Sequence, residues 1–111
     1  MGKFSRDKGK RGELELASSL RDLGFPDAHR SQQFCGSSSS ADLLGVPGIH
    51  IEVKQCERLS IYDAYEQAVR DSEGTNAIST VFHRRSGKPW LAVLSLEDWA
   101  KVYQKYNSER K

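Results

Sequence analysis

The chain has 111 residues, the size of one domain with a single hydrophobic core. Hydrophobic residues make up 37% and charged residues 29%, and the apolar residues recur in periodic runs, which argues against disorder over most of the length. No run approaches the roughly 18 apolar residues of a membrane span, so we expect no membrane partner. The formal net charge is only +2, but basic residues cluster at 3–11 and 83–88. Such clusters suit a polyphosphate partner or, equally, a solvated tail and a solvated turn.

The N-terminal residues MGKFSRDKGKR lack the apolar segment of a secretory signal, so we expect a cytoplasmic protein. Cys35 and Cys56 do not have C-x-x-C spacing, which predicts two reduced thiols and no zinc site. Residues 36–40, GSSSS, have the composition of a flexible loop.

A first helix is predicted over residues 8–23, because Gly24 and Pro26 supply the usual stop signals. The apolar residues at helical spacing are Leu16, Ala17, Leu20 and Leu23. Glu13 falls on the same face, one turn earlier. A carboxylate directed at a core costs several kcal/mol unless something compensates it. Glu13 is therefore a candidate functional residue, unless it reaches solvent in the first turn near the positive end of the helix dipole.

Three strands are predicted to follow, over residues 28–34, 41–46 and 49–56. Pro47 and Gly48 fit the two central positions of a tight turn, so the last two of these strands form a hairpin. The hairpin brings Asp42 towards Glu52 on the neighbouring strand.

The second half of the chain is predicted to contain a helix over 61–72, strands over 77–84 and 90–94, and a last helix over 96–106. Ser60 and Ser95 stand at the N-cap positions of the two helices. Residues 107–111 are expected to fray. The whole order predicts an α/β fold with a central mixed sheet of about five strands flanked by helices.

Three carboxylates are unusual for their predicted positions: Glu13 on an apolar helix face, Asp42 in an apolar strand and Glu52 in a β-branched strand. If they converge, their repulsion requires a cation between them, and hard oxygen ligands suit Mg²⁺ or Mn²⁺. Lys54 follows Glu52 on the same strand face. A divalent ion beside a lysine suits phosphodiester hydrolysis, because the ion lowers the pKa of a bound water and the lysine stabilises developing charge. The alternative is a surface hairpin with salt bridges.

Four segments carry a resemblance to a known family: KGKRGELELASSLRDLGF, ADLLG, IHIEVK and IYDAYEQA. In this order and spacing they resemble the PD-(D/E)XK nuclease superfamily, and within it the archaeal-type Holliday junction resolvases and their phage relatives. The resemblance covers about residues 8–94. It implies a restriction-endonuclease-like fold for a single domain over residues 1–111, with a basic N-terminal arm over 1–8. Ala41 departs from the signature, because a proline gives the family its name at that position, but the position ligates nothing.

The resemblance also implies a metal site. Asp42 and Glu52, helped by the Val53 carbonyl, would bind Mg²⁺, and Mn²⁺ could substitute for it. Glu13 would contribute directly or through a water; we prefer Glu13 to Glu15, because Glu15 falls on the polar face of the helix.

The other implied residues act on the water or on DNA. Lys54 would assist the attacking water, and Gln67 would position the site from the neighbouring helix. The candidate DNA contacts are Lys8, Lys10, Arg11, Arg30, Arg84 and Arg85. Contacts of this kind position a duplex and read no sequence, so recognition would depend on the shape of a branched or bent substrate.

The predicted function is a metal-dependent, structure-selective DNA endonuclease, a Holliday junction resolvase that acts as a homodimer and makes paired nicks. The phage-like resemblance favours a virus, in which case the cytoplasm is that of the host. The alternatives are a nuclease of this superfamily acting on flaps, single strands or foreign duplex, a non-catalytic nucleic-acid-binding protein of the same fold, and an interaction protein without nucleic acid. His50 is expected to be a solvated strand histidine, and His83 to belong to a DNA-facing or solvent-facing turn.

Overall fold

A computed structural model of the chain describes residues 3–31 and 41–110, with side chains from residue 9 onwards in these ranges. Its elements are α1 (Lys3–Asp22), β1 (His29–Arg30), β2 (Leu43–Leu44), β3 (Ile49–Gln55), α2 (Ile61–Asp71), β4 (Ile78–Arg84), β5 (Leu91–Val93) and α3 (Leu96–Ser108). The helices lie where apolar residues recur at helical spacing, and the longer strands lie where they alternate with polar ones. Within this described part, no helix is both long enough and apolar enough to cross a membrane.

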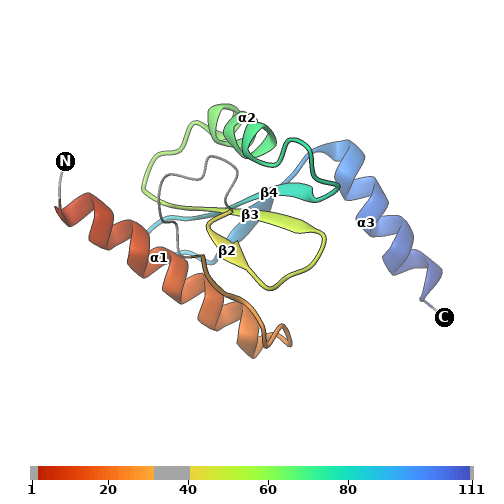
Figure 1. Cartoon of the computed structure of the whole chain (residues 1–111), viewed down its shortest axis with the longest axis horizontal. Coiled ribbons are helices and arrows are strands. Elements are labelled where there is room, and N and C mark those ends of the chain that lie inside the picture. Colours follow the sequence, from red (N-terminus) through yellow and green to blue (C-terminus); the bar gives the residue numbers. More distant parts are fainter. Residues whose placement is uncertain (1–2, 32–40, 111) are drawn as a thin grey trace.

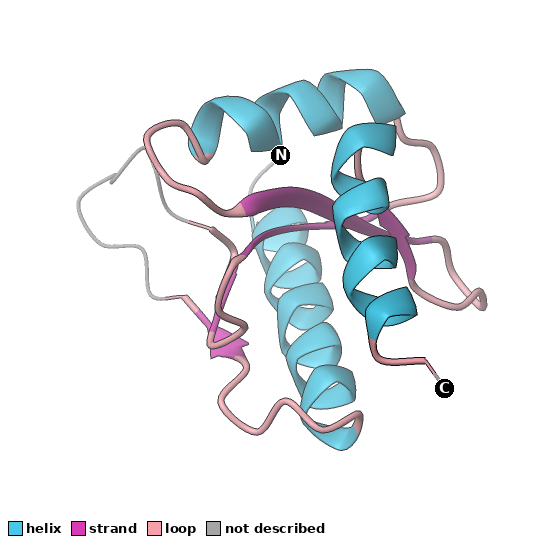
Figure 2. Ribbon diagram, turned by 90° about the vertical axis from the view of Figure 1, so that its right-hand side faces the viewer, coloured by secondary structure: helices cyan, strands magenta, loops and turns pink. Residues whose placement is uncertain are grey.

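The strands of the described chain form one five-stranded mixed sheet in the order β1-β2-β3-β4-β5. β3 and β4 run parallel and are joined by α2, whereas the other neighbouring pairs are antiparallel. α1 lies on one face of the sheet and α2 on the other, while α3 stands apart at the end of the molecule (Figures 1 and 2). The predicted α/β fold, a mixed sheet of about five strands flanked by helices, is confirmed.

The main core lies between α1 and the sheet, and its buried residues are Leu16, Ala17, Leu20, Ala28, Leu43 and Ile51. A smaller core lies between α2 and the sheet and contains Ala64, Ala68 and Val81. The two alanines carry small side chains, so α2 can approach the sheet closely. Leu23, predicted on the apolar face of the first helix, is instead 73% exposed, because α1 has already ended at Asp22.

Several boundaries differ from the prediction. α1 begins at Lys3 and not at residue 8, so most of the predicted basic arm is helical; its lysines and arginine are good helix formers. The strand predicted over 28–34 is observed as β1 alone, and its residues from 32 on lie outside the described ranges. α3 extends to Ser108, so the first residues of the predicted frayed tail are helical.

β2 is shorter than the predicted strand over 41–46 because Gly45 ends it. Gly45 has a φ of 94°, and a Cβ atom placed there would meet the Asp27 carbonyl oxygen at 1.9 Å. The next turn forms as predicted: the Ile49 amide donates to the Val46 carbonyl at 3.2 Å, and Gly48 has a φ of 87°. Pro47 and Gly48 thus occupy the central positions of a type II turn, which sets the register of the hairpin.

Candidate functional site

β3 presents two different faces, because side chains alternate along a strand. Ile51 and Val53 pack into the core beside α1. His50, Glu52 and Lys54 lie on the opposite face, the one covered by α2. Glu52 is only 4% exposed, although it is a carboxylate in the middle of a strand. A group buried in this way requires a hydrogen bond, a proton or a cation.

Asp42 lies directly before β2 and opposite Glu52. The register pairs Leu43 with Ile51 in antiparallel strands, so the next residues along, Asp42 and Glu52, face each other. The Asp42 amide donates to the Ile51 carbonyl at 2.8 Å, and Asp42 Oδ2 accepts a hydrogen bond from the Val53 amide, also at 2.8 Å. The Asp42 carboxylate therefore replaces a backbone partner for β3 and is fixed beside Glu52. The structure brings these two predicted site residues together.

Glu13 borders the same site from α1. Its Oε1 accepts a hydrogen bond from Arg30 Nε at 2.5 Å, which ties α1 to β1. Burial and the charge of Asp42 raise the pKa of Glu13, and the Arg30 guanidinium opposes both effects. The effect of Asp42 on this pKa requires the two carboxylates to be near each other. Glu15, by contrast, pairs with Arg84 of β4 at 2.7 Å.

The acids of the site hold protons more tightly than isolated acids do. Burial, followed by the charges of Asp42 and Asp71, raises the pKa of Glu52 to about 8. Burial also raises the pKa of Asp42, against the opposing effects of the Val53 amide and Lys54. Lys54 lowers the pKa of both Glu52 and Asp42 and is therefore close enough to act on both. Lys54 therefore does not offset the effects of burial and of the neighbouring carboxylates on these two pKa values.

Two residues of the site were missed or misplaced by sequence reasoning. His50 is not a solvated histidine: it is 6% exposed, and its Nε2 lies 2.8 Å from Glu52 Oε2. Burial lowers the pKa of His50, against the opposing charges of Asp71 and Asp42. Asp71, at the end of α2, lies close to both of these residues. Its position could have been found, since it is three residues after Ala68 on the helix face that meets the sheet.

Gln67 does not join this group in the structure. It is exposed on α2, whereas Ala64 and Ala68 face the sheet. His83 lies within β4 and not in the turn after it, and its Nε2 lies 2.9 Å from the Cys56 carbonyl oxygen. The predicted turn position of His83 is wrong, because β4 continues to Arg84.

The predicted DNA contacts fall into three groups. Lys10, Arg11 and Arg85 are exposed, whereas the side chain of Lys8 lies outside those the structure describes. Arg30 is tied to Glu13, as described above. Arg84 is the most constrained of the set: its guanidinium lies 5.2 Å from the Trp90 ring centroid and donates to Glu15 at 2.7 Å.

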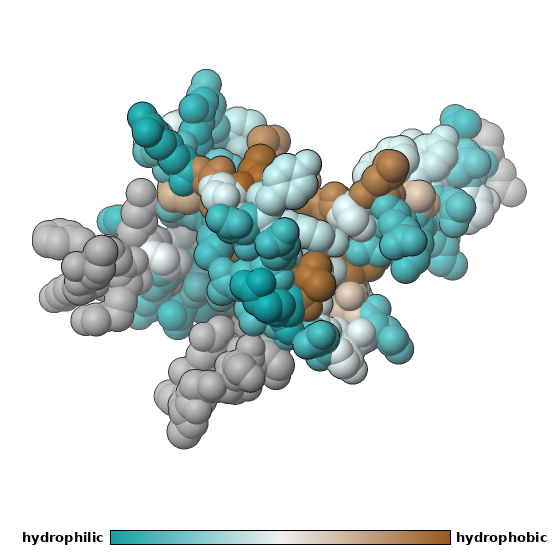
Figure 3. Space-filling view, turned by 90° about the horizontal axis from the view of Figure 1, so that it is seen from above, coloured by the Kyte–Doolittle hydropathy of each residue, from teal (hydrophilic) through white to brown (hydrophobic). Residues whose placement is uncertain are grey.

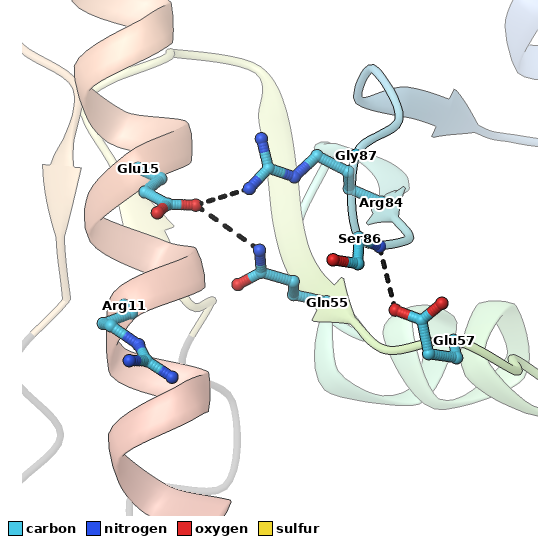
Figure 4. A pocket seen from close by; sticks show the side chains of 7 residues that line it. All are labelled: Arg11, Glu15, Gln55, Glu57, Arg84, Ser86 and Gly87. Carbon is cyan, nitrogen blue, oxygen red and sulfur yellow. Dashed lines mark hydrogen bonds and ion pairs between the residues drawn. The ribbon is translucent and has the colours of Figure 1, made fainter.

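A polar pocket of about 310 Å³ lies where α1 meets the ends of β3 and β4 (Figure 4). Arg11 and Glu15 reach it from α1, Gln55 from β3 and Arg84 from β4. Its two arginines are balanced by two glutamates, since Glu57 also lines it. The pocket therefore lacks the excess positive charge of a dedicated phosphate site.

The donor atoms of the site fit a divalent cation. Asp42 and Glu52 offer carboxylate oxygens side by side, and Glu13 stands at the border. Their raised pKa values arise from burial and mutual repulsion, both of which a bound cation relieves. Carboxylates of this kind are ligands for Mg²⁺, Mn²⁺ or Ca²⁺, and the absence of cysteine among them disfavours zinc.

The fold and the arrangement of acids and lysine on β2 and β3 define a class: the protein has the fold of a resolvase-type nuclease. The chain is similar to the 1.6 Å structure of Hjc, a Holliday junction resolvase from the archaeal hyperthermophile Archaeoglobus fulgidus. The two are 25% identical with a TM-score of 0.58, over 78% of this chain and 72% of that chain. The resemblance to archaeal-type resolvases is thereby confirmed. No protein-family model and no curated protein matches the chain.

Proposed function

We propose that the protein is a Mg²⁺-dependent endonuclease that hydrolyses phosphodiesters in DNA, with Mn²⁺ able to replace Mg²⁺. The observation that carries the proposal is the meeting of Asp42, Glu52 and Lys54: a half-buried and a buried carboxylate that face each other, with a lysine on the same strand face as Glu52. The likeness to Hjc supports a nuclease. A binding protein without catalysis would gain nothing from buried carboxylates beside a phosphate.

Each residue has a distinct task in this proposal. Asp42 and Glu52, with the Val53 carbonyl, hold the cation, which when bound polarises the phosphodiester and lowers the pKa of a water. Lys54 orients that water and stabilises the negative charge that develops on the phosphate oxygens. Glu13, fixed by Arg30, adds a carboxylate at the border of the site.

Gln67 is assigned a role towards the bound substrate. It lies on the exposed side of α2 and is free to position a DNA strand that passes over the site. Phosphate contacts come from the exposed residues Lys10, Arg11 and Arg85, together with Lys8, Arg30 and Arg84. Such contacts make affinity depend on salt and carry no sequence information.

We assign four-way junctions as the substrate, because Hjc is a Holliday junction resolvase. The direct test is cleavage of a labelled four-way junction beside linear duplex, flap and single-stranded DNA, with Mg²⁺ or with EDTA. Paired nicks on the junction alone, lost in EDTA and in Glu52→Ala, are expected. A matched control is Glu66→Gln, which neutralises an exposed carboxylate on α2 and keeps full activity.

Other outcomes separate the parts of the proposal. Cleavage of flaps or single strands in place of the junction would keep the nuclease and discard the junction. Tight DNA binding without cleavage, in Mg²⁺ and in Mn²⁺, would leave only a binding platform on the nuclease fold.

The proposed active form is a homodimer, and α3 with β5 is its interface. α3 has no buried residue in the described chain, and it exposes Leu96, Trp99, Val102, Tyr103 and Tyr106. β5 is an edge strand. Seen from above, α3 extends away from the body, and apolar surface gathers where it joins (Figure 3). An apolar helix beside a sheet edge is a surface that a second copy can cover.

The interface is tested by light scattering after size exclusion. Wild type is expected at twice the mass of one chain, and Val102→Asp at the mass of one. Gln104→Asp places the same charge on the other side of α3 and is expected to stay dimeric. A monomeric wild type would refute the dimer.

A further inference from the structure

A second group of ligand atoms lies next to the proposed metal site. His50 Nε2 or Nδ1, a carboxylate oxygen of Glu52 and one of Asp71 lie within 4.8 Å of one another. His50 and Glu52 come from β3, and Asp71 comes from the last turn of α2, so the group joins the sheet to the helix. His50 is 6% exposed and Glu52 is 4% exposed. Two of the three members are therefore buried and Asp71 is half-buried, so the group is not a chance meeting of surface acids.

Neither lysine nor arginine forms an ion pair with this group among the described residues. In the described part of the chain, the ion pairs made by lysine or arginine neutralise Glu13, Glu15 and Asp98. None of them includes Glu52 or Asp71. His50 Nε2 lies 2.8 Å from Glu52 Oε2 and belongs to the group itself. Lys54 follows Glu52 along β3, on the side away from His50. A buried carboxylate beside a second carboxylate is costly unless a proton or a cation relieves the repulsion, so the group favours a bound cation.

His50 is also accessible from one side. It borders a hollow of about 550 Å³, formed mainly by residues 43–49 of the hairpin and by Thr75 and Ala77. The hollow places the imidazole beside space that an ion can enter from the side of the hairpin. This distinguishes the group from a sealed structural pair.

We propose that His50, Glu52 and Asp71 form a second cation site, which shares Glu52 with the first site and takes Mn²⁺ in preference to Mg²⁺. The preference follows from the imidazole, since nitrogen suits Mn²⁺ and later transition ions, whereas Mg²⁺ keeps oxygen ligands and waters. The inference rests on the proposed function, because Glu52 is assigned there to the first ion. It adds His50 and Asp71 as metal ligands, and it explains why a histidine is buried against a carboxylate.

The test counts bound Mn²⁺ without measuring activity. Metal-free protein is titrated with Mn²⁺, and free Mn²⁺ is followed by electron paramagnetic resonance. Wild type is expected to bind two Mn²⁺ per chain, and excess Mg²⁺ to displace only one, with at least about a tenfold preference for Mn²⁺ at the other. Asp71→Asn and His50→Asn are expected to bind one. Glu73→Gln, which removes an exposed carboxylate two residues from Asp71, is expected to bind two.

The failures of the two proposals are distinguishable. Asp42→Asn removes the first site and is expected to leave one Mn²⁺, held by His50 and Asp71. One Mn²⁺ in wild type, unchanged in Asp71→Asn and absent in Asp42→Asn, would overturn the second site and leave the proposed nuclease intact. No Mn²⁺ in any form would refute both.

A measurement on wild type alone guards against misfolded variants. Bound Mn²⁺ broadens the nuclear magnetic resonance signals of nearby nuclei, so the His50 ring signals should vanish while one Mn²⁺ remains bound in excess Mg²⁺. Sharp His50 signals under those conditions would exclude the imidazole as a ligand.

Discussion

The pKa of Glu52 predicts how stability changes with pH. Burial and the charges of Asp42 and Asp71 raise this pKa from 4.5 to about 8 in the metal-free fold. The folded protein therefore keeps a proton that the unfolded chain has released. For an acid whose pKa is higher in the folded than in the unfolded state, the contribution of the bound proton to stability is fully present below the unfolded pKa. This contribution is lost as the pH rises through the folded pKa. Between about pH 6.5 and 8.5 the loss in free energy of unfolding is about 2 kcal/mol.

Glu52→Gln removes this dependence, because glutamine keeps the shape and has no proton to release. We expect its free energy of unfolding in EDTA to change by less than about 0.5 kcal/mol over the same interval, against about 2 kcal/mol for wild type. Urea unfolding at the two pH values measures both. The interval lies above the titration of His50, whose pKa is lowered by burial.

Added Mg²⁺ tests the same reasoning from the opposite side. The ion replaces the proton on Glu52, so it should stabilise wild type more at high pH than at low pH, and the variant little at either. Glu66→Gln, an exposed neutralisation on α2, should behave as wild type does. Equal pH slopes for wild type and Glu52→Gln would refute the reasoning, because Glu52 would then titrate alike in the folded and unfolded states.

Three further predictions concern catalysis and packing. Lys54→Ala should lower the cleavage rate by about 10²–10³ while Mn²⁺ binding stays within about twofold, because it removes the group that orients the water and stabilises charge in the transition state but leaves the metal ligands in place; single-turnover cleavage and calorimetry measure the two. Ile51→Ala should cost about 2–5 kcal/mol in urea unfolding, since Ile51 is 1% exposed in the main core. Gly45→Ala should cost about 1–3 kcal/mol or prevent folding, because its φ of 94° and the close carbonyl leave no place for a Cβ atom, and a wild-type melting temperature would contradict this.

The hairpin shows what local sequence can predict. Pro47 and Gly48 determine a turn whose geometry needs no distant contact, and the turn sets the register. Alternation along the strands then places Asp42 opposite Glu52. This pairing was predictable because every step is local. The inward position of Glu13 was predictable for the same reason, from helical period alone.

The burial of His50 and the approach of Asp71 depend instead on tertiary contacts. Sequence reasoning treated the His50 face of β3 as exposed to water, whereas α2 covers it. Two small residues, Ala64 and Ala68, allow α2 to pack closely there. Only the parallel crossover from β3 to β4 brings the end of α2 back to the start of β3, where Asp71 meets His50. The helical period shows that Asp71 lies on the face of α2 that meets the sheet, but no local pattern shows that it meets His50.

Asp42 has a structural role in the sheet and a proposed role as a metal ligand, and two substitutions can separate these roles. Its Oδ2 accepts a hydrogen bond from the Val53 amide of β3. The short β2 does not extend far enough to offer that amide a backbone carbonyl. Asparagine can accept the same hydrogen bond but carries no charge. Asp42→Asn should therefore stay within about 1 kcal/mol of wild type in urea unfolding, lower the pKa of Glu52 and lose cleavage. Asp42→Ala leaves the Val53 amide without a partner and should lose stability as well as cleavage, by about 1–3 kcal/mol. Equal stability of the two variants would show that the carboxylate serves the metal alone and that water satisfies the strand edge.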